Sequence, residues 1–243
     1  MMDLKKTARA RARWDRNARF YDFMSRFMEG KKARVWLTNL WGSIKGQEIL
    51  EVGVGTGRSF PYYPGGLTIT AIDFSGGMLS KARQKAHRLG LSVNLRQMDV
   101  QKLEFADDSF DTVVASCVFC SVPDAVLGLQ EIRRVIRPGG RLVLLEHVRH
   151  DNKFIGKIMD LLNPLFTRFS GPAINRRTLE NVRKAGMDID TVEDMAMGGI
   201  LKFIIASPAK NGQQEYQGNS TRERNPHAAY AGEAPAGRRV TGR

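Results

Sequence analysis

The stretch Glu51–Gly57, which reads EVGVGTG, decides the fold class of this 243-residue chain. The apolar run from Glu48 to Val52 predicts a short buried strand, and a helix is expected after the last glycine. Glycine at the alternate positions Gly53, Gly55 and Gly57 allows a sharp turn and lets a ligand approach the main chain closely. Such a turn between a strand and a helix is typical of nucleotide-binding α/β proteins.

Downstream of this turn, short apolar runs punctuated by glycine alternate with stretches of helical periodicity. This alternation predicts an α/β fold: a Rossmann-like, seven-stranded, mostly parallel sheet with helices on both faces. The strands are expected at Glu48–Val52, Thr68–Asp73, Ser92–Gln97, Asp111–Ser116, Arg141–His147, Asp188–Asp194 and Lys202–Ser207. The helices are expected at Arg58–Tyr62, Gly76–Leu89, Pro123–Ile136 and Thr178–Ala185. Ser75 is the expected N-cap of the second helix, and Pro138–Gly140 should end the third and turn into a strand.

Three segments lie outside this alternation. Residues 5–41 have apolar side chains at steps of three and four, which predicts two helices separated by Gly30. Phe154–Phe169 predicts an inserted helix that Pro164 should kink or break. From about residue 210 large apolar residues almost disappear, which indicates a disordered tail. We therefore divide the chain into a basic helical segment (1–45), an α/β domain (46–209) and a tail (210–243).

The chain is strongly basic, with a formal net charge of +13 and a pI of about 10.1. Residues 1–41 hold eleven Lys or Arg and four Asp or Glu, a local charge of +7. This balance favours an anionic partner, either nucleic acid or a membrane rich in acidic lipid. A solvated helix face that aids solubility explains the charge equally well.

Two cysteines in a chain of this length argue against a disulfide framework and indicate a reducing compartment. The Cys117-x-x-Cys120 spacing suits redox or zinc chemistry, but no second Cys or His pair supplies the remaining zinc ligands. We therefore expect two small apolar residues at the end of a buried strand, and no metal. No apolar region follows the basic N-terminus, and no run approaches the roughly 18–20 apolar residues that span a bilayer. The expected location is cytoplasmic, with peripheral contact at the inner membrane surface as an option.

Two carboxylates are spaced for an adenosine ligand. Asp73 closes the strand after the glycine turn, where a carboxylate can bind both ribose hydroxyls. Asp99 follows the third strand and can accept a hydrogen bond from the adenine amino group, although an ordinary loop carboxylate is the alternative. A dinucleotide site requires a further glycine at the position that Arg58 occupies. The pattern therefore disfavours an NAD oxidoreductase.

Together these residues resemble the signature of class I S-adenosylmethionine (SAM)-dependent methyltransferases, over the range Tyr21–Pro208. The blocks Phe105–Asp111 and Leu129–Gly140 are similar to those of the group that includes the ubiquinone/menaquinone C-methyltransferases. The resemblance implies that residues 46–209 bind SAM as cofactor and transfer its methyl group. This in-line displacement depends on positioning, and a general base is needed only when the acceptor enters protonated.

The resemblance also implies roles for individual residues. The expected cofactor-binding residues are Glu51, Gly53, Gly55, Gly57, Asp73, Phe74, Met78, Asp99, Val100, Ser116 and Cys117. The glycines would hold the methionine part of SAM with Glu51 at its edge, and the last two residues would face the methyl group. Tyr21 resembles an aromatic residue brought over the cofactor, with a core aromatic as the equal alternative. His147 could take a proton from the acceptor, but a surface-loop histidine without a role is the alternative.

The acceptor class follows from finer resemblances. The stretches Arg13–Asp22 and Glu51–Tyr63 are similar to those of soluble bacterial phosphatidylethanolamine N-methyltransferases. Leu145–Val148 and Asn175–Thr178 look closer to membrane-associated thiol methyltransferases, and Tyr21–Ser25 is shared with the quinone enzymes. We expect a small-molecule or lipid acceptor, first a phospholipid amine, then a quinone carbon or a thiol. The basic N-terminal helix beside an apolar 154–169 helix would suit an anionic membrane, unless the latter helix covers core.

Two further alternatives stay open. A nucleic-acid methyltransferase would explain the charge, but the amino-methylating enzymes usually carry an Asn/Asp-Pro-Pro-aromatic block after the fourth strand. Here that place holds Cys117–Pro123, which disfavours nucleic acid as a partner. A non-catalytic SAM-binding scaffold is the non-enzyme alternative.

Overall fold

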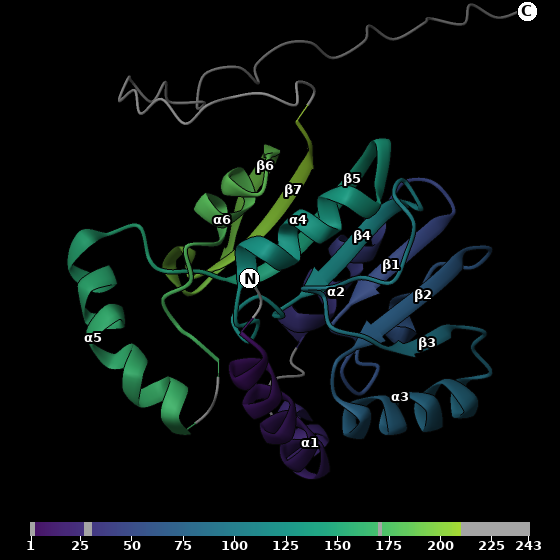
Figure 1. Ribbon diagram of the computed structural model, residues 1–243, viewed down its shortest axis with the longest axis horizontal. Helices are drawn as coiled ribbons and strands as arrows, with labels where there is room; N and C mark the ends of the chain where they lie inside the picture. Colours follow the sequence, from purple (N-terminus) through teal and green to yellow (C-terminus); the bar gives the residue numbers. More distant parts are fainter. Residues whose placement is uncertain (1–2, 27–30, 170–171, 210–243) are drawn as a thin grey trace, which may run out of the picture. The chain divides into compact units, whose positions relative to one another are not determined.

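The computed structural model describes residues 3–26, 31–169 and 172–209, and within them all side chains except those of 19–26, 31, 168 and 169 (Figure 1). Three expectations lie outside the described residues. They concern the side chain of Tyr21, the helix boundary at Gly30 and the tail 210–243.

The sheet is seven-stranded, in the order β3-β2-β1-β4-β5-β7-β6 (Figure 1). Its strands are β1 (Glu48–Val52), β2 (Thr68–Asp73), β3 (Asn94–Gln97), β4 (Phe110–Ser116), β5 (Ile136–His147), β6 (Met187–Ala196) and β7 (Leu201–Pro208). The pairs β5–β7 and β7–β6 are antiparallel and the other four pairs are parallel, so the predicted Rossmann-like, mostly parallel sheet is confirmed. The chain leaves β1 toward β2 and β3 and then returns to β4 on the other side. Adjacent loops diverge at this switch point and open a crevice at the carboxyl ends of the strands.

Helices cover both faces of the sheet. Successive strand residues point to opposite sides, so apolar side chains are buried on each face. Val113 packs with α4 (Ala125–Val135) and α6 (Thr178–Lys184) in one buried cluster. Its neighbour Val114 packs with α2 (Lys31–Gly42) in another cluster, on the opposite face. A third cluster lies under α3 (Gly76–Leu89), which begins where β2 ends. The two-sided core explains why the strands read as nearly continuous apolar runs.

Of three expectations about where helices begin and end, one is confirmed and two are wrong. Ser75 caps α3, its Oγ accepting a hydrogen bond from the Met78 amide at 3.2 Å. The expected helix at Arg58–Tyr62 is wrong, because only a 3-10 turn forms at Phe60–Tyr62, and Tyr63, which precedes Pro64, is extended. The expected turn at Pro138–Gly140 is also wrong. These residues lie inside β5, which already pairs with β4 at Ile136 and shifts register before Arg141.

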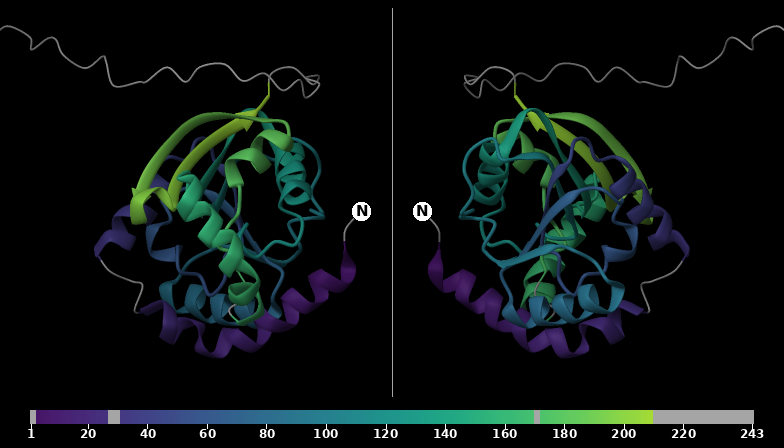
Figure 2. Two further views of the ribbon diagram at one scale, coloured as in Figure 1. Left: turned by 90° about the vertical axis from the view of Figure 1, so that its left-hand side faces the viewer. Right: turned by 90° about the vertical axis from the view of Figure 1, so that its right-hand side faces the viewer.

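Three helices lie outside the strand–helix alternation: α1 (Leu4–Arg26), α2 and α5 (Lys153–Phe169). The predicted break in α5 is wrong, because the helix continues through Pro164. The Thr167 hydroxyl donates to the Asn163 carbonyl at 3.0 Å, and the Asn163 side chain accepts from the Ile174 amide at 3.0 Å, which supports the turn around the proline. Figure 2 shows α1 and the end of α5 side by side. A hydrogen bond of 2.9 Å from the Arg13 guanidinium to the Thr167 carbonyl joins the two helices. Within the described ranges, no helix combines the length and apolar character needed to cross a bilayer.

Candidate active site

An open cleft with an empty volume of about 690 Å³ lies at the carboxyl ends of β1, β2, β3 and β4, at the switch point of the sheet. Most of its lining comes from the segments that follow these strands, with one residue from α1. The lining residues are Trp14, Val52, Gly53, Gly55, Ile72, Asp73, Phe74, Met78, Met98, Asp99, Val100, Ser116, Cys117, Val118, Ser121, Val122 and Pro123. Nine of the eleven expected cofactor-binding residues are therefore brought together here.

The glycine turn forms one wall of the cleft. Gly53 and Gly55 have φ angles of +69° and +57°, in the region that favours glycine. The Gly53 amide donates to the Ile72 carbonyl at 2.8 Å, which fixes the turn against β2. A Cβ atom at Gly53 would lie 2.5 Å from Val118, whereas one at Gly55 would meet no atom within 4 Å. Gly53 thus lets the segment after β4, which carries Val118 and forms the opposite wall of the cleft, lie close to the glycine turn. Gly55 leaves its main chain open to a ligand.

Asp73 lies at the end of β2 and is almost fully buried. Its Oδ2 accepts from the Gly55 amide at 2.9 Å and its Oδ1 from the Ser75 amide at 2.8 Å. Burial raises the pKa of Asp73 to about 6, against the lowering effect of these two amides. Each carboxylate oxygen has a second lone pair, so the group can still accept from two hydroxyls of a ligand.

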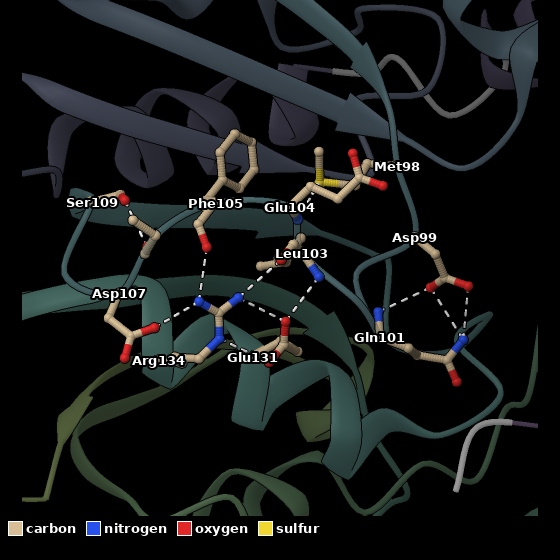
Figure 3. Close-up of polar contacts among 11 residues, drawn as sticks. Met98, Asp99, Gln101, Leu103, Glu104, Phe105, Asp107, Ser109, Glu131 and Arg134 are labelled. Atoms are coloured by element: carbon tan, nitrogen blue, oxygen red, sulfur yellow. Dashed lines mark hydrogen bonds and ion pairs between the residues drawn. The ribbon is translucent and has the colours of Figure 1, made fainter.

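The third strand end positions a second carboxylate. Asp99 lines the cleft, and both of its oxygens accept from the Gln101 side chain, at 3.1 and 3.0 Å (Figure 3). The Gln101 amide group also donates to the Thr7 hydroxyl at 3.2 Å and accepts from the Asp124 amide at 3.0 Å. Gln101 therefore ties Asp99 to α1 and to the start of α4. Gln101 was not predicted as a site residue, because no pattern near it in the sequence indicates contacts with distant segments.

An arginine holds the loop that follows. Arg134 donates to the carbonyls of Leu103 and Phe105, at 2.9 and 2.8 Å, and pairs with Asp107 and Glu131 (Figure 3). These bonds fix the segment between β3 and β4, which carries Asp99 at its beginning.

The wall after β4 depends on a buried acid. Cys117 has a φ angle of +55°, and the next two amides, of Val118 and Phe119, donate to Glu146 Oε1 at 2.7 and 3.1 Å. Burial raises the pKa of Glu146 to about 7. Glu146 is absent from the expected site residues, although a charge directly after the apolar run Leu142–Leu145 was the available signal.

Two expected site residues lie behind the glycine turn instead of lining the cleft. The Glu51 carboxylate accepts from the Ser59 hydroxyl at 2.5 Å and from the Tyr63 hydroxyl. Burial raises its pKa to about 7. A Cβ atom at Gly57 would lie 2.3 Å from the Phe60 ring, so this glycine accommodates the aromatic side chain. Both residues hold the turn from the side away from the cleft.

The two expected catalytic residues have different outcomes. His147 ends β5 and does not line the cleft itself. Its Nδ1 lies 3.4 Å from Sγ of Cys117, and Cys117 does line the cleft. Burial lowers the pKa of His147, which favours the neutral imidazole. The side chain of Tyr21 is outside the described residues. Trp14, earlier on α1 and within the stretch Arg13–Asp22, supplies an aromatic lining residue that was not among the expected site residues.

The cysteine pair has the surroundings of a core element. Burial raises the pKa of the Cys120 thiol to about 12 and that of Cys117 further still, and such thiols are poorly reactive. Within the part of the chain that the structure describes, no cluster of three or more His, Cys, Asp or Glu residues could hold a metal ion.

Solved structures share this fold. A SAM-dependent methyltransferase from Aquifex aeolicus has a TM-score of 0.58 and 20% sequence identity, over 79% of this chain and 97% of that one. At this identity the likeness concerns the fold alone. A family profile described as a methyltransferase domain matches residues 50–144.

Curated relatives extend the likeness to most of the chain. A phosphatidylethanolamine N-methyltransferase of Cereibacter sphaeroides is 39% identical over 211 residues, which cover 84% of this chain and 98% of that protein. A ubiquinone/menaquinone biosynthesis C-methyltransferase of Geotalea daltonii is 32% identical over 62% of this chain and 71% of its own length. A thiol S-methyltransferase of Mus musculus is 35% identical over 50% of this chain and 52% of its own length. The chain therefore belongs to the class I SAM-dependent methyltransferases, and SAM is its cofactor.

Proposed function

We propose that this methyltransferase transfers the methyl group to the amine of a membrane phospholipid of the phosphatidylethanolamine type, in peripheral contact with an anionic membrane surface. The observation that carries this proposal is the 39% identity to a phosphatidylethanolamine N-methyltransferase over 98% of that protein's length. The quinone and thiol enzymes match shorter parts of this chain, 62% and 50%.

In this proposal the cleft holds SAM along the strand ends. Asp73 accepts from the ribose hydroxyls, and Asp99 beside Val100 binds the adenine. The open main chain at Gly55 approaches the methionine part. Ser116 and Cys117, which line the cleft at the end of β4, would then lie beside the methyl group. Phe74 and Met78 complete the lining around the adenosine.

The chemistry requires little from the protein beyond placement. Bound SAM would supply an electrophilic methyl group: an amine nitrogen would form a bond to the methyl carbon as the carbon–sulfur bond breaks, and the positive charge would pass from sulfur to nitrogen. An ammonium acceptor must lose a proton first, and His147, kept neutral by burial, is the proposed base. Aromatic faces stabilise a sulfonium, which is the proposed role of Tyr21 and fits the position of Trp14.

The lipid assignment is tested with methyl-labelled SAM and a total lipid extract. We expect the label in the organic phase, in a phospholipid with a methylated amine, and faster incorporation when anionic vesicles are present. Label in quinones or in thiols would support the two alternative acceptors. Label confined to RNA or protein would reject the lipid assignment.

SAM affinity is expected to depend on pH through Asp73. The ribose hydroxyls donate to the ionised carboxylate, so SAM favours that form and must displace a proton below the pKa of about 6. Affinity should therefore fall as pH drops from 7 to 5, by up to about tenfold per unit below the pKa, and stay level above it. Calorimetry across this range measures the effect, and an Asp73→Asn variant should show none of it. A flat profile in the unaltered protein would contradict the assignment of Asp73 to the ribose.

A further inference from the structure

The helix α5 is attached to the protein through its polar face. The Asp160 carboxylate accepts from the Arg149 guanidinium, with a shortest distance of 2.9 Å, and from the Asn175 amide at 3.0 Å. One turn later the Asn163 side chain accepts from the Ile174 amide at 3.0 Å. A helix that covers a core has the opposite orientation, with polar residues toward solvent. The alternative that this helix simply covers core is therefore wrong for its large apolar residues, although Met159 on the attached side is buried.

The apolar face of α5 points outward. Its exposed large residues, spaced by steps of one, three and four, are Phe154 (73%), Ile155 (38%), Ile158 (42%), Leu161 (79%), Leu162 (40%), Leu165 (55%) and Phe166 (43%). At 100° per residue these positions fall on one side of the helix, away from Asp160 and Asn163. Soluble proteins rarely expose a contiguous apolar surface of this kind unless it binds something.

Basic side chains lie beside this apolar face. Lys153 and Lys157 of α5 are exposed. The adjoining α1, bonded to α5 through Arg13, exposes further cations: Lys5, Lys6, Arg9, Arg11 and Arg16. An apolar face with cations at its margin suits the boundary between acyl chains and anionic headgroups. Pairing with a second copy of the chain would bring two such basic regions together.

We propose that the exposed face of α5, the seven residues Phe154, Ile155, Ile158, Leu161, Leu162, Leu165 and Phe166, inserts into the interfacial region of an anionic bilayer. The basic residues of α1 then contact the headgroups. This inference rests on the proposed lipid acceptor. It also places the cleft close to the bilayer, because Trp14 of the same α1 lines it.

The test is sedimentation of the full chain with vesicles of phosphatidylcholine and phosphatidylglycerol in a ratio of about 3:1. About one quarter of the lipid in these vesicles is anionic. The test variant is Leu161→Ser with Leu165→Ser, and the matched control is Leu89→Ser with Val192→Ser, which are also exposed but lie on α3 and β6. The test variant should lower the partition coefficient at least about tenfold, since two leucines no longer enter the acyl boundary. The control should bind as the unaltered protein does, and pure phosphatidylcholine should bind all of them several-fold more weakly.

Two further measurements separate this inference from the proposed function. Methylation of phosphatidylethanolamine dispersed in detergent should be the same in the unaltered protein and both variants. If the lipid is methylated in detergent but the test variant binds vesicles as well as the control, the docking inference is overturned and the lipid acceptor stands. If vesicle binding responds as expected but only a quinone or thiol is methylated, the proposed acceptor falls instead. Ultracentrifugation showing a dimer that the test variant dissociates would assign the face to a second copy and overturn the inference.

Discussion

An Asp73→Ala variant is expected to bind SAM roughly 5- to 150-fold more weakly, which corresponds to about 1–3 kcal/mol for the loss of a charged hydrogen-bonding partner. The change removes the proposed acceptor of the ribose hydroxyls. It also removes the acceptor of the Gly55 and Ser75 amides, which lie 2.9 and 2.8 Å from the carboxylate. The glycine turn thereby loses its link to the start of α3. Isothermal titration calorimetry with SAM and S-adenosylhomocysteine measures the effect.

The matched control is Asp190→Ala. Asp190 carries the same group on β6, where it accepts only an exposed hydrogen bond from Ser207. Its loss should leave SAM affinity unchanged. Thermal unfolding of both variants shows whether the protein stays folded at the temperature of the titration. An unaltered dissociation constant for a folded Asp73→Ala variant would remove this residue from the site.

A Gly53→Ala variant is expected to lose SAM binding by at least about tenfold and stability by about 2–4 kcal/mol, from two separate costs. The first cost is the φ angle of +69°, which a residue with a Cβ rarely adopts. The second is the position of the new methyl group, 2.5 Å from a Val118 methyl on the opposite wall. Relief of this contact requires the Val118 side chain, or the segment that carries it, to move away from the glycine turn. Chemical denaturation and calorimetry measure both effects.

Gly66→Ala is the control for the first cost alone. Its φ angle is +79°, and a Cβ there would meet no atom within 4 Å. Only the backbone cost of about 1–2 kcal/mol is expected, with SAM affinity preserved. The wall-to-wall contact would be unimportant if Gly53→Ala proved no more harmful than this control.

The fold was largely predictable because its strands are buried on both faces and its helices are periodic. The ranges of β1, β2 and α3 agree with those expected from the sequence. The errors arose where a local rule met a tertiary contact. Pro164 would end an isolated helix, but contacts of Thr167 and Asn163 support the turn in α5. The glycines at Pro138–Gly140 suggested a turn, but pairing with β4 begins before them.

The site was predictable to the extent that strand ends define it. Parallel strands bring their carboxyl ends to one edge, so spacing alone could place Asp73 and Asp99 at a common cleft. Trp14, Gln101 and Glu146 were missed because their positions depend on contacts between segments distant in the sequence. For Trp14, the decisive contacts are those that hold α1 against α3.

Those contacts have a consequence for how the cofactor enters and leaves. Asp15 accepts from the Ser75 hydroxyl at 2.5 Å and from the Gly77 amide at 3.0 Å, directly beside Asp73. Trp14, the residue before Asp15 on α1, lines one side of the cleft. The helix α1 thus lies along one side of the nucleotide site and is bonded to the start of α3 there. Withdrawal of α1 from α3 opens that side of the site, so release of the spent nucleoside and displacement of the first helix are geometrically coupled.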